Sequence, residues 1–154
     1  MYEVERGGNS LILLASGTVH AGFESPAADY EEERINLNEY VSNYPNATFY
    51  IKVEGDCMNG SGIYSGDLLV VDRSLAVKEG DIIVAALDGD FVLRIYIKKD
   101  SKIILMPDNP NYDPIIISEF MKFEVWGVVP HTILNQIQQR NVRLDRLQQF
   151  LRQL

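Results

Sequence analysis

Short apolar runs separated by turn residues fill the middle of this chain, from residue 46 to residue 134. Residues 49–54 alternate between apolar and polar side chains, with the period of two that is typical of a half-buried β-strand. Further apolar runs suited to strands follow at residues 68–71, 82–87, 91–97, 103–106 and 123–129. Many short strands with turns between them predict a mainly β fold, either a barrel or a folded sheet.

Two segments between these runs have the composition of turns and loops. Asp88-Gly89-Asp90 separates two of the apolar runs, and glycine accepts the positive φ that a tight hairpin turn requires. We therefore predict a β-hairpin over residues 82–97. Residues 108–114 read Asp-Asn-Pro-Asn-Tyr-Asp-Pro, which predicts a loop.

The composition fits a single domain with flanking segments and argues against several kinds of site. The chain has 154 residues, of which 46% are hydrophobic, enough to bury one core. Its net charge of −8 repels phosphate groups, so we expect no direct contact with nucleic acid. The single cysteine excludes an internal disulfide and a cysteine-built zinc site, and the two histidines are far apart in sequence. We expect neither a metal nor another cofactor.

Residues 1–45 form an N-terminal arm with little core material of its own. A short helix is predicted near its end, with Asn36 as the N-cap and Pro45 as the stop. Its apolar stripe consists of Leu37, Tyr40, Val41 and Tyr44. We expect this stripe to pack on the main domain, with binding of a separate partner as the alternative. The chain shows no secretion signal and no apolar run long enough to span a bilayer, so we expect a cytoplasmic protein without a membrane contact.

Residues 135–154 form a third zone with the composition of an amphipathic helix. They are rich in Gln, Arg and Leu and contain neither Gly nor Pro. A heptad-like seam runs through positions 133, 137, 140, 144, 147, 151 and 154, with an arginine at 140. This helical tail would either associate with a second copy or a partner, or lie on its own domain. Four arginines against one aspartate make it locally basic.

Four ordered sequence blocks resemble the LexA-like self-cleaving peptidases. The first is Gly55-Asp56-Cys57-Met58, where that family has Gly-Asp-Ser-Met, followed by residues 62–63 and 66–72. The other blocks cover residues 80–91, 109–115 and 125–129. Together they span residues 49 to 129. The resemblance implies a β-rich peptidase fold with an N-terminal arm over residues 1–45 and a peptidase domain over residues 46–134.

Within this family the chain is similar to the UmuD-like members, over residues 20 to 132 or so. Residues 21–30 and 34–38 resemble the arm that carries the scissile bond in those proteins. The resemblance implies a homodimer in which the arm lies in its own or its neighbour's active site. It also implies RecA-filament-stimulated self-cleavage between Ala21 and Gly22, and binding of the product to a Y-family polymerase for translesion synthesis. The helical tail lies beyond the resemblance.

The resemblance places Cys57 at the position of the serine nucleophile and Arg94 at that of the lysine base, 37 residues further on. An arginine cannot act as a base, because its guanidinium has a pKa above about 12 and stays protonated. A neighbouring cation favours a cysteine thiolate, which needs no base, but the leaving amine must still gain a proton. We therefore expect impaired cleavage and a role as a polymerase accessory or regulator. An active peptidase that uses a Cys57 thiolate is the alternative.

Other interpretations of these residues stay open. Cys57 on its own would be a small buried hydrophobic residue, and Arg94 an exposed charge or an ion-pair partner. Ser61 is a candidate replacement nucleophile, although it should point away from the site. His20 adjoins the Ala21–Gly22 bond and could shuttle protons, but an idle histidine is the simpler expectation. An active homologue could cut this chain in trans, or the chain could block active relatives by forming mixed dimers with them.

Overall fold

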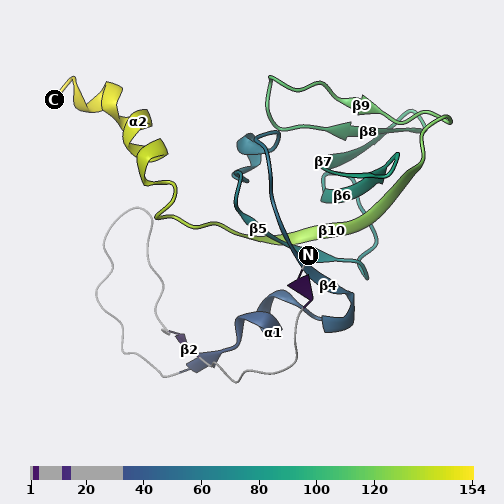
Figure 1. The fold of residues 1–154 in the computed structure, drawn as a ribbon, viewed down its shortest axis with the longest axis horizontal. Helices are drawn as coiled ribbons and strands as arrows, with labels where there is room; N and C mark the ends of the chain where they lie inside the picture. The colour runs from purple at the N-terminus through teal and green to yellow at the C-terminus, as the bar shows by residue number, and fades with distance from the viewer. Residues whose placement is uncertain (1, 4–11, 15–32) are drawn as a thin grey trace.

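The computed structural model describes residues 2–3, 12–14 and 33–154 of the chain. Eight strands form the main sheet in the order β1-β4-β5-β10-β6-β7-β8-β9, and every neighbouring pair is antiparallel (Figure 1). Their bounds are Tyr2–Glu3 (β1), Thr48–Lys52 (β4), Leu68–Asp72 (β5), Ile82–Leu87 (β6), Asp90–Lys99 (β7), Lys102–Met106 (β8), Ile115–Ile116 (β9) and Phe123–Ile133 (β10). This architecture confirms the expectation of a mainly β, folded-sheet domain.

The remaining elements are short. β2 (Ile12–Leu14) and β3 (Glu33–Ile35) pair with each other in a separate two-stranded sheet. The helices are α1 (Leu37–Val41) and α2 (Arg140–Leu151), with 3₁₀ turns η1 (Pro45–Ala47) and η2 (Asn59–Ser61). β1 belongs to the sequence-predicted arm, yet it pairs with β4 at the edge of the main sheet. No helix in the described part of the chain is long and apolar enough to cross a membrane.

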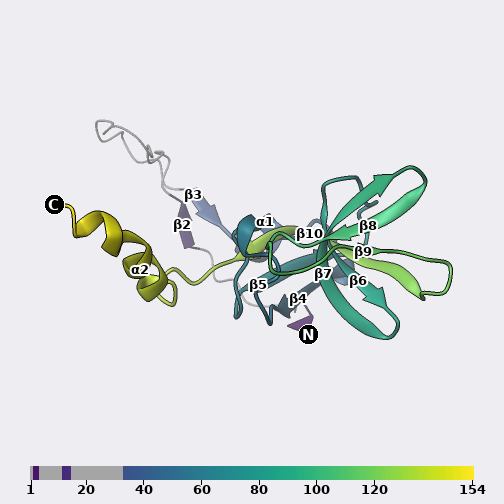
Figure 2. The same ribbon diagram turned by 90° about the horizontal axis from the view of Figure 1, so that it is seen from above.

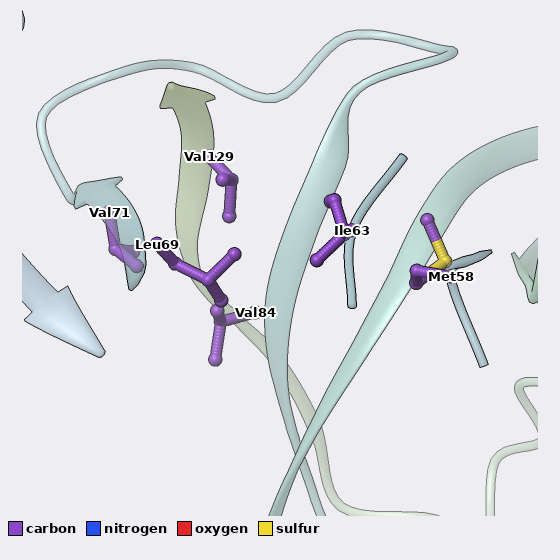
Figure 3. Packing of buried hydrophobic residues seen from close by; sticks show 6 residues of the cluster. All are labelled: Met58, Ile63, Leu69, Val71, Val84 and Val129. Carbon is purple, nitrogen blue, oxygen red and sulfur yellow. The ribbon is translucent and has the colours of Figure 1, made fainter. Parts of the chain in front are cut away.

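β6 is an uninterrupted apolar run because both of its faces are buried. Val84 belongs to a first core cluster, and Ile83 and Ala85 belong to a second. The first cluster consists of Met58, Ile63, Leu69, Val71, Val84 and Val129 (Figure 3). The buried members of the second are Ile83, Ala85, Leu105 and Val128. Successive side chains of a strand point to opposite faces, so one strand supplies both clusters.

The predicted hairpin over residues 82–97 is confirmed. β6 and β7 pair from Ile82↔Ile95 to Leu87↔Asp90. The turn between them has positive φ at Asp88 (49°) and Gly89 (90°). Two successive residues with positive φ are the mark of the turn that best matches the twist of an antiparallel pair.

Helix α1 begins where the sequence predicts and ends early. The Asn36 side chain accepts a hydrogen bond from the Asn38 backbone N–H at 3.0 Å, which confirms Asn36 as the N-cap. The helix ends at Val41, so Tyr44 falls outside it. Because so short a helix cannot present a continuous stripe, Leu37, Tyr40 and Tyr44 remain 58%, 65% and 62% exposed. The expected packing on the main domain is therefore wrong for Leu37 and Tyr44, whereas the Tyr40 ring does contact it, with its centroid 6.0 Å from that of His131 in β10.

Helix α2 projects away from the sheet in both views (Figures 1 and 2). None of its residues is buried, so the alternative in which the tail lies on its own domain is not realised here. The predicted seam is also too long. Its first position, Ile133, pairs with Leu68 at the end of β10, and Ile137 precedes the helix. Strand pairing fixes Ile133 in extended backbone, which leaves a seam only from Arg140 onward.

Candidate active site

Cys57 lies in the loop between β4 and η2, and this loop is fixed on both sides. Before Cys57, the Val53 N–H donates to the Asp67 carbonyl at 2.9 Å, and the chain turns through Gly55 with a φ of 95°. After it, Met58 is 1% exposed and anchors the loop in the first core cluster. The Asp108 N–H also donates to the Cys57 carbonyl at 2.9 Å. The position of Cys57 is thus set by the core and by the loop that follows β8.

Arg94 lies on β7, opposite Ile83 of β6, and its guanidinium reaches Cys57. Its Nη1 donates to Cys57 Sγ at 3.1 Å and to the Leu93 carbonyl at 2.8 Å. The thiol of Cys57 faces the same carbonyl, with Sγ 3.6 Å from the Leu93 oxygen. Both side chains are half-buried. The structure therefore brings together the two residues that the sequence placed as nucleophile and base, although it does not assign their roles.

The simpler interpretations of these two residues fit less well. Arg94 is neither exposed nor ion-paired, since the salt bridge found among the described residues joins Arg73 to Glu124 at 4.0 Å. Cys57 does pack against the first core cluster, but its sulfur also accepts a charged N–H. Ser61 donates to the Asp108 carboxylate at 2.6 Å, so its hydroxyl is engaged away from Cys57.

Tyr112 is a further site residue, which the sequence analysis did not single out. Its hydroxyl donates to the Asp56 carboxylate, and its ring centroid lies 6.0 Å from the Arg94 guanidinium carbon. The hydrogen bond to Asp56 and the charge of that carboxylate raise the pKa of Tyr112 above its ordinary value of 10.0. The hydroxyl therefore remains a donor near neutral pH. The signal that could have found Tyr112 is its place inside the block at residues 109–115.

A cleft of about 410 Å³ opens beside this constellation. It is lined by the segment from Ile51 to Cys57 on one side and by residues 91–94 of β7 on the other, with Tyr112 at its margin. Gly55 and Asp56 line it together with Cys57, and Met58 lies buried behind. The predicted cleavage site, Ala21 and Gly22, and the neighbouring His20 lie outside the described residues, so the structure does not place them.

The chemistry available to Cys57 follows from these contacts. Arg94 offers a permanent positive charge and N–H donors, and the Leu93 oxygen accepts a hydrogen bond from the thiol without being a base. No group of three or more His, Cys, Asp or Glu side chains in the described ranges is placed to hold a metal ion. The site can donate hydrogen bonds to a carbonyl or carboxylate group, but neither polar group that the described residues place against the sulfur is a base.

Comparison with known proteins finds several relatives that share most of this chain. It is 44% identical to Protein SamA of Salmonella typhimurium strain LT2 over 110 residues, which cover 71% of this chain and 75% of SamA. It is 38% identical to Protein MucA of Escherichia coli over 117 residues, which cover 75% of this chain and 80% of MucA. LexA repressor 1 of Geobacter sulfurreducens is 37% identical over 114 residues, which cover 74% of this chain and 56% of the repressor. Residues 13–130 match the family described as Peptidase S24-like, and the chain belongs to that family.

Proposed function

We propose that this chain is a UmuD-like protein of the SOS response to DNA damage that acts mainly by binding other proteins, with self-cleavage slow or absent. One observation carries the proposal. Arg94 Nη1 lies 3.1 Å from Cys57 Sγ, at the position where the resemblance expects a lysine base. In this proposal the cleft has a positive charge beside the nucleophile position, while an arginine stands where the group that should accept a proton is expected.

The energetic argument concerns two proton transfers. Acyl transfer to Cys57 needs a thiolate, and release of the amine of residue 22 needs a proton donor. Arginine supplies neither transfer because it does not lose its proton. Each missing proton-transfer function typically costs about 10²–10⁴-fold in rate. A chain so impaired would stay mostly uncut unless an active homologue cut it in trans.

The partners in this proposal are proteins. They include a second copy of the chain, the RecA filament and a Y-family polymerase, for which the chain would be an accessory or regulator in the cytoplasm. Mixed dimers with active UmuD-like relatives are a variant of the same role. Co-expression with a competent relative tests it, because a decoy would lower that relative's cleavage and a bystander would not.

A second function is favoured by the direction of one hydrogen bond. The Arg94 guanidinium donates to Cys57 Sγ at 3.1 Å, and a thiolate at that position would attack a carbonyl without a base. In that case the chain is a hydrolase that cuts itself between Ala21 and Gly22 when the RecA filament binds it. Arg94 would then stabilise the nucleophile instead of activating it.

Incubation with an activated RecA filament separates the two functions. We expect the purified chain to stay at full length under conditions in which a relative with the intact Ser/Lys pair is cut. Alkylation of Cys57 provides the control within the same molecule. A shortened product that starts at Gly22, and that alkylation abolishes, would establish the peptidase and overturn the binding role as the main function.

The helical tail yields a separate prediction. Deletion of residues 135–154 should lower the oligomer size or weaken partner binding, since no residue of α2 is buried against the domain. Sedimentation velocity and a binding titration measure the two effects. The free energy of unfolding of the remaining domain should change little, which distinguishes loss of a contact from loss of the fold. Unchanged sedimentation and unchanged binding would contradict the role assigned to the tail.

A further inference from the structure

The cleft beside Cys57 contains a cation that has no anionic partner among the described residues. Among the described residues, the Arg94 side chain donates two hydrogen bonds, both from Nη1. The acceptors are the Cys57 sulfur and the Leu93 backbone carbonyl. The Nε atom is buried and has no acceptor within the described ranges. Carboxylates are the usual partners of half-buried guanidinium groups, because two parallel N–H···O bonds compensate for the loss of water.

The other charged side chains of the cleft do not fill this role. Lys52, Glu54 and Asp56 line the cleft but are exposed, whereas Arg94 is half-buried. The Asp56 carboxylate already accepts a hydrogen bond from the Tyr112 hydroxyl. Arg94 is therefore the charged lining residue that is most withdrawn from water, and it is the one whose pairing with an anion would gain most.

The walls of the cleft suit a short stretch of extended chain. Apolar side chains from four strands of the main sheet line it, namely Ile51 of β4, Leu69 of β5, Val84 of β6 and Leu93 of β7. Its volume of about 410 Å³ lies within the range of sites that hold small ligands. Apolar walls next to one withdrawn cation match the end of a peptide, where side chains are followed by a carboxylate.

We propose that this cleft binds the free C-terminal carboxylate of a peptide, with the carboxylate paired to Arg94. The inference rests on the proposed function, because a cleft that holds a chain without cutting it can retain a chain end. The ligand class includes the fragment that ends at Ala21, which forms if an active homologue cuts this chain in trans. An intact chain that continues through Gly22 has no carboxylate at that place and would bind more weakly.

Two forms of one peptide test the proposal with the complete protein. The peptide covers residues 16–21 with an acetylated N-terminus, and its C-terminus is either the free acid or the uncharged amide. Titrations followed by NMR shifts should show the amide binding at least about tenfold more weakly than the acid, because only the acid pairs with the guanidinium. Equal affinities, or no saturable binding of the acid at millimolar concentration, would overturn the proposal.

Two variants locate the effect. Arg94→Gln should abolish the difference between acid and amide, whereas Lys52→Gln, which removes the exposed cation of the same cleft, should preserve it. A preference for the acid that survives in Arg94→Gln, or disappears in Lys52→Gln alone, would refute the assignment to Arg94. The wild-type comparison remains decisive even if Arg94→Gln does not fold. The two experiments have independent outcomes. Equal binding of acid and amide would overturn the carboxylate site without changing the result of the RecA incubation. Self-cleavage in that incubation would overturn the proposed function, and the preference for the acid could still be measured.

Discussion

A chain that carries both Cys57→Ser and Arg94→Lys should cut itself between Ala21 and Gly22 when an activated RecA filament is present. Nη1 of Arg94 already lies 3.1 Å from Sγ, so a lysine at position 94 can bring an amine close to a serine hydroxyl at position 57. A lysine, unlike an arginine, can lose its proton in a half-buried site and act as the base. Restoring proton transfer should raise the cleavage rate by about 10²–10⁴-fold or more. Mass spectrometry of the fragment that begins at Gly22 measures it.

The single variants serve as controls for this gain of function. Cys57→Ser alone should remain uncut, because its hydroxyl then has only a permanently protonated neighbour. Adding Ser61→Ala to the double variant should leave cleavage in place, because Ser61 donates to Asp108 and not to the Cys57 position. A double variant that folds and shows only full-length chain would count against the assignment of this cleft as the peptidase site.

Met58→Ala should produce the largest loss of stability among substitutions near the site. Met58 is 1% exposed and packs within the first core cluster, so truncation leaves a cavity there (Figure 3). Such truncations typically lower the free energy of unfolding by about 2–5 kcal/mol. Urea denaturation followed by circular dichroism measures this change. We also expect Cys57 to be alkylated faster, because the loop that holds it loses its anchor.

Two control substitutions test whether the loss of stability in Met58→Ala comes from lost core packing. Met58→Leu nearly conserves volume and should cost less than about 1.5 kcal/mol. Leu75→Ala removes a comparable side chain from an exposed position and should change stability by no more than about 0.5 kcal/mol. A loss for Met58→Ala as small as that for Leu75→Ala would show that the loop is not anchored through this side chain.

The strands were predictable where an apolar run ends at a residue that favours a turn. The apolar run at residues 82–87 coincides with β6, and the Asp88-Gly89 turn follows because glycine permits its positive φ. The hairpin between β7 and β8 gives no such signal, since Asp100 and Ser101 adopt φ of 51° and 63° without a glycine. Neighbouring strands impose that turn, and a single sequence does not reveal such a tertiary constraint. β9 has only two residues, Ile115 and Ile116, and is too short to show a period.

The helical segments were less predictable, because the residues at which a helix begins and ends depend on the structure that the flanking residues adopt. Asn36 gave the start of α1 correctly, but the end at Val41 precedes Pro45 by several residues. Ile133 has the spacing of a helical seam, yet pairing with Leu68 in β5 holds it in a strand. Local spacing cannot distinguish these outcomes, since the competing interaction comes from a segment far away in sequence.

The candidate site was predictable only through the resemblance. Cys57 and Arg94 are far apart in sequence, and no periodicity relates them; the family blocks alone suggested that they meet. The partner of Asp56 could not be inferred in the same way, because Tyr112 comes from a loop whose path depends on the whole sheet. The sequence also could not predict that the Arg94 side chain finds no anion in the described part of the chain, because that depends on its contacts in the folded sheet.

The order of the strands also determines when the domain can be completed during synthesis. β10 joins β5 to β6 in the middle of the sheet, although it is the last strand to leave the ribosome. Until Ile133 has emerged, each half of the sheet has an unpaired strand edge that is open to other nascent chains. The two halves are β1-β4-β5 and β6-β7-β8-β9. The pairing of β10 with β5 joins residues from Val128↔Asp72 to Ile133↔Leu68, which are far apart in the sequence, and such high contact order slows folding. Chaperones that shield strand edges should therefore matter most just before β10 is released.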